Sequence, residues 1–427
     1  MQLKLEPKIY RSELSGDEYH LYHHPSGLDI LIMPLPGFTT TEALFATKYG
    51  SVNNCFKTVD TGDFISVPDG IAHYLEHKLF EGEECGVFER YASTGASANA
   101  FTSFDVTAYT FSASSDYEEP LSILLDFVQH PYITEENVEK ERGIIAQEIK
   151  MSNDSPVRAL FFELLQSVYH NHPVKIDIAG TVDSIQSITA SLLMKCHETF
   201  YNMNNMVLSI AGNVDDETVL RICDEQLAPS VNKQLELFVP DEPDTVVKSR
   251  SVITREIGVP MFNLGFKCPP LKGRDLLKTS IAADLMLKVL FGSMSEWYRD
   301  AFENGLINST FGTEVFSSEQ GYFMLILSGE AKDPDAVYES ISRKISSLDY
   351  SGFDRQLLNT MIKGGYGSEI MKYNNVSECA ESMCFCYVQG VSCFDNLKIM
   401  SDLTPEEVFE TTRLLDMDRS SFCIVRK

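Results

Sequence analysis

Three short segments of this chain recur in the same order roughly 210 residues further on. The stretch 71–79 (IAHYLEHKL) matches 281–289 (IAADLMLKV) in its Ile, Ala, Leu and Lys, at an offset of 210. Two further pairs of segments follow at similar offsets: 110–121 with 325–337, and 185–189 with 399–404. Echoes that keep their order and spacing indicate duplication of one folding unit. The sequence therefore predicts two homologous halves.

The third pair of segments also predicts local structure. Thr189 and Thr404 each stand where a helix would begin, since threonine is a favoured N-cap residue. Each of these helices is followed by an apolar strand, 206–212 in the first half and 422–427 in the second. Strand pairs separated by helices, without strict alternation, favour an α+β layer sandwich in each half over a doubly wound sheet.

The boundary between the halves is predicted in a stretch that lacks strand or helix periodicity. Residues 234–247 contain two prolines and several acids, which is typical of an exposed linker. The expected domains are therefore 1–233 and 248–427.

Composition limits the classes of partner. The net charge is −27, which argues against nucleic acid and against an anionic membrane surface. The N-terminal residues do not have the pattern of a signal or transit peptide, and no run of 18 apolar residues predicts a membrane span. Ten scattered cysteines without a CxxC pair are typical of reduced thiols. We therefore expect a cytoplasmic protein.

His73, Glu76 and His77 are the first candidate residues for a metal site. A helix is predicted over 65–80, and on a helix two histidines four residues apart lie on one face, where they can grip one zinc ion. Glu76 shares that face and could take a proton from zinc-bound water. The order H-x-x-E-H is a known zincin variant. Chance or structural histidines are the alternative.

A catalytic zinc site needs a third protein ligand. The predicted helix around 135–152 carries Glu141 and Glu148 seven residues apart, on a stripe that also holds Ile144 and Ile145. Carboxylates on an apolar stripe are costly unless they are paired or bind metal. The alternative is a pair of solvated glutamates at the edge of an amphipathic helix.

The duplication offers an independent check on the motif. Its three positions become Ala283, Met286 and Leu287 in the second half. The same helix is apolar there, so the fold itself does not require His73, Glu76 and His77.

These residues resemble the pitrilysin/insulinase family of inverted-zincin metallopeptidases, and within it a bacterial YmfH-like subgroup. The resemblance covers nearly the whole chain, and its H-x-x-E-H…E set is specific. The matching segments are 73–77, 141–148, 95–111, 172–180, 200–214 and 303–312.

The resemblance implies roles for these residues. His73, His77 and Glu148 would bind Zn²⁺, Glu76 would be the general base and Glu141 would support the ligands. The family fold implies two homologous α+β layer-sandwich domains of the LuxS/metallohydrolase type, closing like a clamshell around a peptide substrate. The peptide would add a strand along an edge, which falls here on Ala98, Asn99, Ala100 and Phe101.

One part of the family pattern is missing. Many active members carry an Arg…Tyr pair around a Gly-Leu in the second half, which binds the substrate carbonyl. Gly305-Leu306 is present, but the Tyr position is Asn308 and the Arg position is Ala301, with Arg299 two residues further back. The resemblance therefore suggests the zinc-bearing subunit of a heterodimer whose homologous partner supplies Arg and Tyr; a homodimer stays open.

Two other functions stay open from the sequence. The chain could be a catalytically weak or inactive scaffold or maturation subunit of a peptidase-like complex, which the missing Arg/Tyr pair favours. It could also be a binding protein with structural zinc. Three ligands beside a free carboxylate fit an open catalytic site better than a closed structural one.

Overall fold

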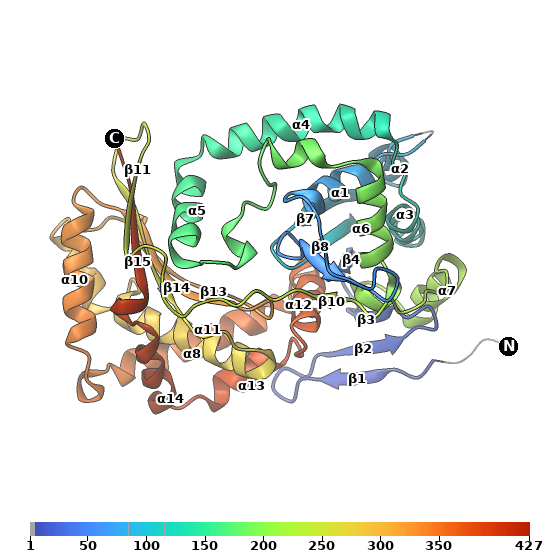
Figure 1. Ribbon diagram of the computed structural model, residues 1–427. Helices are drawn as coiled ribbons and strands as arrows, with labels where there is room; N and C mark the ends of the chain where they lie inside the picture. Colours follow the sequence, from blue (N-terminus) through green and yellow to red (C-terminus); the bar gives the residue numbers. More distant parts are fainter. Residues whose placement is uncertain (1–4, 84, 115) are drawn as a thin grey trace. The chain divides into compact units, whose positions relative to one another are not determined.

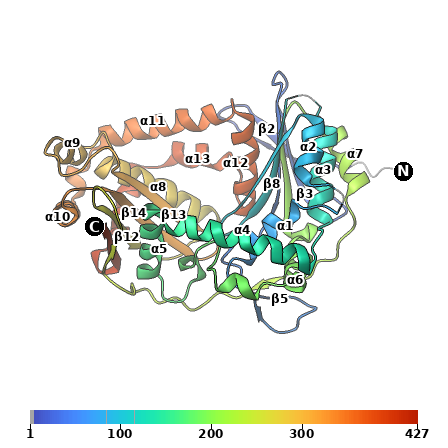
Figure 2. The same cartoon turned by 90° about the horizontal axis from the view of Figure 1, so that it is seen from above.

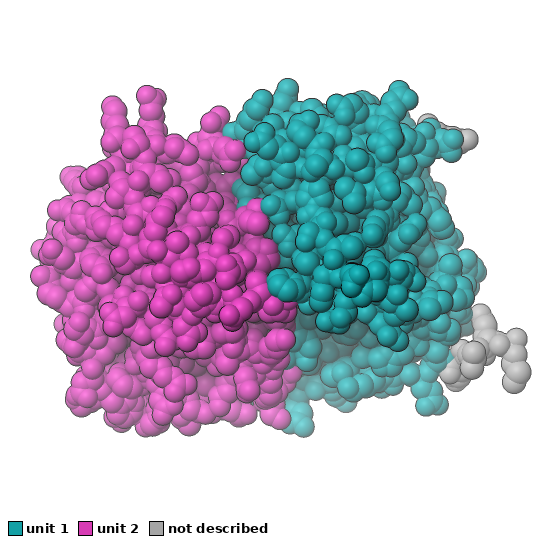
Figure 3. All heavy atoms as spheres, viewed as in Figure 1, with its two compact units in different colours: residues 1–150, 177–238, 370–394 teal, residues 151–176, 239–369, 395–427 magenta. Residues whose placement is uncertain are grey.

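The computed structural model describes residues 5–83, 85–114 and 116–427 (Figure 1). The chain folds into two compact units, which are coloured separately in Figure 3. Unit 1 consists of residues 1–150, 177–238 and 370–394, and unit 2 of residues 151–176, 239–369 and 395–427.

Unit 1 is built on a seven-stranded sheet in the order β1-β2-β3-β9-β4-β8-β7. Neighbouring strands are antiparallel except β3 and β9, which run parallel. The strands are β1 (Lys8–Arg11), β2 (Glu18–His23), β3 (Asp29–Pro34), β4 (Thr41–Thr47), β7 (Ser97–Thr102), β8 (Thr107–Ala113) and β9 (Met206–Gly212). A small second sheet joins β10 (Glu236–Leu237), β5 (Cys55–Lys57) and β6 (Ile65–Ser66).

Helices bury the inward-facing side chains of this sheet. Alternate strand residues such as Phe45, Tyr109 and Leu208 lie in one apolar core with Leu75 and Leu124 from the helices. This alternation follows from the two-residue period of a strand. The helices of the unit are α1 (Ile71–Leu79), α2 (Val87–Thr94), α3 (Glu118–Gln129), α4 (Glu135–Asn153), α6 (Ala190–Phe200), α7 (Asp216–Gln226) and α12 (Val376–Val388).

Unit 2 repeats the central part of this topology. Its sheet has the order β11-β15-β12-β14-β13, and only β11 and β15 are parallel. The strands are β11 (Arg250–Thr254), β12 (Met261–Lys267), β13 (Gly312–Ser318), β14 (Tyr322–Glu330) and β15 (Ser420–Arg426). Strand by strand, this is the order and direction of β3-β9-β4-β8-β7. Such agreement is what a duplicated folding unit predicts.

The two units exchange one equivalent helix. Helix α5 (Pro156–Val168) packs on β11, β12 and β15 of unit 2, and α12 packs on β3, β4 and β9 of unit 1 (Figure 2). Gly265 on β12 allows the close approach of α5, because a Cβ there would lie 3.0 Å from Leu164. The other helices of unit 2 are α8 (Gly273–Phe291), α9 (Glu296–Glu303), α10 (Pro334–Ser346), α11 (Arg355–Lys372), α13 (Asp395–Asp402) and α14 (Pro405–Glu410).

Several local expectations can be compared with the structure. Thr189 and Thr404 cap α6 and α14, as predicted, and Thr404 forms a full capping box. The helix expected over 65–80 begins only at Ile71, since residues 65–66 form β6. Among the described residues, no helix is both long and apolar enough to cross a bilayer.

The compact units of the fold differ from the contiguous domains expected from the sequence. Because of the helix exchange, the compact units do not coincide with the contiguous stretches 1–233 and 248–427. That these stretches are the duplicated domains stays a prediction. Residues 234–247 are largely exposed, but they contain β10, which was not expected.

Candidate metal centre

Helix α1 presents the H-x-x-E-H residues, and Gly70 sets its start. Gly70 has φ 89°, and a Cβ on it would lie 2.4 Å from the carbonyl oxygen of Ala179. Glycine is therefore needed here both for the left-handed backbone and for the close approach. From this start, α1 buries Ile71 and Leu75 in the core of unit 1.

Helix α4 presents the two glutamates, and Figure 1 shows it running beside α1. Ile145, between Glu141 and Glu148, is fully buried, so this face of α4 packs inward as expected. Ile144 was placed on the same stripe, and this was wrong: its side chain is 52% exposed. A helix turns about 100° per residue, and this turn carries Ile144 from the buried face at Ile145 to the accessible side of α4.

His73, His77 and Glu148 come together as one cluster. Their potential ligand atoms all lie within 4.8 Å of one another. His73 Nε2 is 3.5 Å from Glu148 Oε1, and His77 Nε2 is 3.5 Å from Glu148 Oε2. Zinc bonds of about 2.0–2.1 Å in a tetrahedron separate ligand atoms by about 3.3 Å. The donor set and its spacing therefore fit a tetrahedral zinc ion.

Exposure within the cluster is uneven. The His73 side chain is 12% exposed, that of His77 25% and that of Glu148 44%. Each of the three side chains is thus partly accessible to solvent, and Glu148 is the most accessible. A fourth coordination position that solvent can reach is what a catalytic zinc site has and a structural one lacks.

Glu141 supports the cluster from behind His77. Its Oε1 lies 3.0 Å from His77 Nδ1, and the glutamate is only 8% exposed. Burial lowers the pKa of His77, but the hydrogen bond to Glu141 and the charges of Glu76, Glu141 and Glu148 raise it more, so its pKa is raised. The surroundings of His77 therefore favour positive charge, as a cation site requires.

Glu76 is held by a residue that the sequence analysis did not single out. Thr102 Oγ1 donates a hydrogen bond to Glu76 Oε2 over 2.6 Å. Thr102 ends β7, directly after the expected substrate edge. The signals in the sequence were its position at the end of that strand and its place within segment 95–111, which matches the family. His73 Nδ1 is buried without a hydrogen-bond partner among the described residues.

The expected substrate segment is an edge strand. β7 pairs only with β8 in the sheet of the described chain, so its other edge is free. Ala98 and Ala100 pack towards the core of unit 1, whereas Asn99 is exposed and the Phe101 ring lies 5.9 Å from that of Phe385 on α12.

The positions of unit 2 that correspond to His73, Glu76 and His77 hold apolar residues. Ala283, Met286 and Leu287 are fully buried in α8, in the core of that unit. Ala301 is 5% exposed and packs in the same core.

The two polar residues near Gly305 are engaged locally. Asn308 donates to Glu330 Oε2 over 3.2 Å and accepts from Thr310. Arg299 is an exposed residue whose Nε lies 3.7 Å from Asp300 Oδ1.

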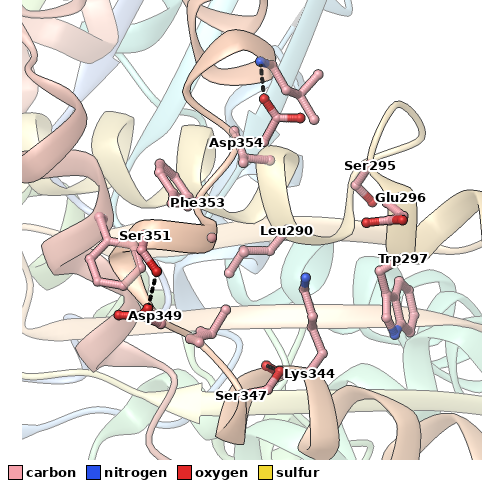
Figure 4. Close-up of a pocket in the computed structure, with 15 residues that line it drawn as sticks. Leu290, Ser295, Glu296, Trp297, Lys344, Ser347, Asp349, Ser351, Phe353 and Asp354 are labelled. Carbon is pink, nitrogen blue, oxygen red and sulfur yellow. Dashed lines mark hydrogen bonds between the residues drawn. The ribbon is translucent and has the colours of Figure 1, made fainter.

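Unit 2 also has a cavity of about 280 Å³. It lies between the end of α8, α9, α10 and the start of α11, and Trp297, Lys344 and Asp354 are among its lining residues (Figure 4). None of the predicted site residues lines it.

Comparisons with known proteins show the family to which the chain belongs. A family model described as "Insulinase (Peptidase family M16)" matches residues 48–182, and one described as "Peptidase M16 inactive domain" matches 187–364. A Bacillus subtilis protein named zinc protease YmfH, itself uncharacterized, is 39% identical over 91% of this chain and 92% of its own length. The chain therefore belongs to the insulinase (M16) family of peptidases.

Solved structures extend the likeness to the whole fold. An M16-like peptidase from Alicyclobacillus acidocaldarius superposes with a TM-score of 0.90 at 34% identity, covering 100% of this chain and 99% of its own. Pitrilysin gives a TM-score of 0.78 at 15% identity, with 99% of this chain matching 46% of that one, which shows the fold alone. The α+β fold class expected from the sequence is confirmed.

Proposed function

We propose that this chain is a zinc-dependent endopeptidase with His73, His77 and Glu148 as its metal ligands. The observation that carries the proposal is the close approach of Glu148 to both histidines. Its Oε1 lies 3.5 Å from His73 Nε2 and its Oε2 lies 3.5 Å from His77 Nε2, and each distance is close to the ligand spacing of a tetrahedral zinc site. That relatives such as YmfH are named zinc proteases supports the same metal.

Each residue then has a defined task. Zinc at this position would supply Lewis-acid chemistry, polarising water and the scissile carbonyl. Glu76 takes the proton of the attacking water and passes it to the leaving amine. Glu141 holds the His77 ring in the tautomer that leaves Nε2 free to bind metal.

The peptide would pair with the free edge of β7. An extended chain along Ala98–Phe101 would make backbone hydrogen bonds there, so affinity would depend little on its sequence. The edge ends at Thr102, which touches Glu76, so a peptide bound along it would run beside the general base.

Activity would depend on a homologous partner subunit, or on a second copy of this chain. The reason is the absence of Arg and Tyr at positions 301 and 308, where donors to the substrate carbonyl are expected. One such donor is worth about 3 kcal/mol of transition-state stabilisation in other enzymes. A scaffold role in a peptidase-like complex is the alternative. The ten free cysteines fit the cytoplasmic location that we keep as part of the proposal.

The decisive experiment measures bound zinc and peptide cleavage together. Purified wild type should hold about one zinc per chain, and Glu148→Gln should lose it, because an amide is a far weaker ligand than a carboxylate. Glu76→Gln should keep zinc and lose activity. Glu136→Gln, an exposed change on the same helix, should alter neither.

Activity should be assayed for the chain alone and with a homologous subunit that carries Arg and Tyr. Cleavage only in the mixture would support the heterodimer. Full activity of the isolated chain would refute the need for a partner. Negligible zinc in wild type and variants, even after zinc is added, would leave the scaffold function instead.

A further inference from the structure

The contact between Thr102 and Glu76 involves one of the two carboxylate oxygens. The hydroxyl of Thr102 engages one carboxylate oxygen, Oε2, over 2.6 Å. In the described part of the chain, the Glu76 side chain makes no other hydrogen bond. Oε1 is therefore the oxygen left to accept a proton from water. A hydrogen bond to a charged carboxylate is among the stronger ones that proteins form.

Thr102 is itself firmly placed. It pairs with Thr107 across the β7–β8 hairpin, and the two hydroxyl oxygens are 3.4 Å apart. Thr107 is fully buried, and its hydroxyl donates to the carbonyl of Tyr49 over 2.9 Å. A β-branched side chain has few χ1 choices in such a setting. The hydroxyl of Thr102 is thus held in one position, from which it can orient the Glu76 carboxylate.

The same threonine belongs to the strand expected to take the peptide. A peptide that pairs along β7 would immobilise the strand up to Thr102, and with it the hydroxyl that holds Glu76. We infer that Thr102 is a positioning residue that couples the general base on α1 to the substrate edge on β7. This inference rests on the proposed endopeptidase function, and it adds a residue that acts through Glu76 rather than on the substrate.

The test compares three variants that differ by single groups. Thr102→Val keeps the shape of the side chain and removes the hydroxyl, and Thr102→Ser restores the hydroxyl. Thr110→Val is the matched control: it removes a half-buried hydroxyl from the same hairpin, one whose acceptor is the carbonyl of Asn99 at 3.5 Å. For each variant we would determine zinc content, kcat and KM (with the partner subunit if activity needs it) and a crystal structure.

The expected result is specific to Thr102→Val. Its zinc content and KM stay within about twofold of wild type, and kcat falls about tenfold, as loss of one charged hydrogen bond predicts. Its crystal structure shows the Glu76 carboxylate displaced or in several conformers. Thr102→Ser recovers most of kcat, and Thr110→Val behaves as wild type.

Two outcomes would overturn the inference. One is a Glu76 carboxylate that keeps its place in the Thr102→Val crystal structure, whatever the activity. The other is an unchanged kcat in that variant while Glu76→Gln is inactive. Failure of the endopeptidase proposal looks different, because the wild type would then hold no zinc and cleave nothing. The crystallographic comparison would still judge the role of Thr102.

Discussion

The ammonium group of Lys78 donates a hydrogen bond to the backbone carbonyl of Asn137 over 3.1 Å, although Lys78 is completely buried. Its second partner is Glu81, at 2.7 Å. One turn earlier, the hydroxyl of Tyr74 donates to the carbonyl of Val138. These contacts join α1, which carries His73 and His77, to the first turns of α4, which carries Glu148. We therefore expect the spacing of the metal cluster to depend on them.

We predict that Lys78→Met weakens zinc binding about tenfold and lowers stability by about 1–2 kcal/mol, because α1 keeps the Tyr74 contact with α4 but loses the Lys78 contact. Competition with a zinc chelator and thermal unfolding would measure both. Lys288→Met is the natural control, since Lys288 occupies the duplicated position. It is about half exposed there, and among the described residues its one ion pair is with Asp284. Exposed pairs contribute at most about 1 kcal/mol. Unchanged zinc affinity in Lys78→Met would contradict the role in spacing.

Glu141→Gln should lower zinc affinity by about 10-fold to 100-fold without changing the fold, because outer carboxylates orient the histidine ligand and raise its basicity. Zinc titration against a competing chelator would measure the change. Glu139→Gln, on the same helix, removes a carboxylate that is 75% exposed and pairs with Arg142, so its affinity should match wild type. Equal affinities for Glu141→Gln and Glu139→Gln would show that the Glu141 contact with His77 does not assist binding.

Glu42 should make stability depend on pH near neutrality. Burial raises its pKa to about 7, with the nearby charge of Glu381 adding to the effect and a hydrogen bond from Ser112 opposing it. The folded state therefore holds a proton that the unfolded state releases at its ordinary pKa of 4.5. Stability from this group is complete below pH 4.5 and is lost as pH rises to 7.

Glu42→Gln should therefore be more stable than wild type above pH 7, on the order of 2 kcal/mol after discounting for partial exposure. Urea unfolding at pH 5 and pH 8 would measure the difference. Glu119→Gln, an exposed change in the same unit, should follow the wild-type profile. A parallel pH dependence for Glu42→Gln and wild type would mean that Glu42 is charged throughout.

A buried ion pair anchors the segment expected to be a free linker. Lys267 Nζ lies 2.6 Å from Glu242 Oε1, and it also donates to the carbonyls of Pro243 and Thr245. The Glu242 carboxylate in turn accepts the backbone amides of residues 170–172 at 2.6–2.8 Å. The Lys267 side chain is 6% exposed and that of Glu242 13%.

Glu242→Gln should destabilise unit 2 by about 3–5 kcal/mol, because Lys267 would be left as a buried charge without its counterion. Urea unfolding and the rate of proteolysis near residue 242 would report the loss. Asp241→Asn changes the exposed neighbouring side chain and should have no effect beyond about 0.5 kcal/mol. Equal stability of these two variants would argue that the linker is free after all.

Some features of the fold could be predicted from the sequence, and others could not. The caps at Thr189 and Thr404, and the strands after their helices, could be predicted because cap chemistry and apolar periodicity act within a few residues. The exchange of α5 and α12 could not be predicted, since nothing local in the sequence selects the sheet on which each helix packs. The same holds for Glu242: its surroundings in the sequence are those of a loop, and its partner Lys267 is 25 residues away.

By itself, the sequence predicted the duplication and the α+β class, because repeat spacing and periodicity are properties of the chain. It also made His73 and His77 candidate metal ligands through residue type and spacing, whereas the family resemblance singled out Glu148 as the third. Only the tertiary structure decided which long-range partners these residues have: Thr102 for Glu76, Glu141 for His77 and Asn137 for Lys78. The physical reason is the distance along the chain over which each interaction acts. Backbone propensities act over one or two turns, whereas a hydrogen bond across 59 or 64 residues exists only once packing has brought two elements together.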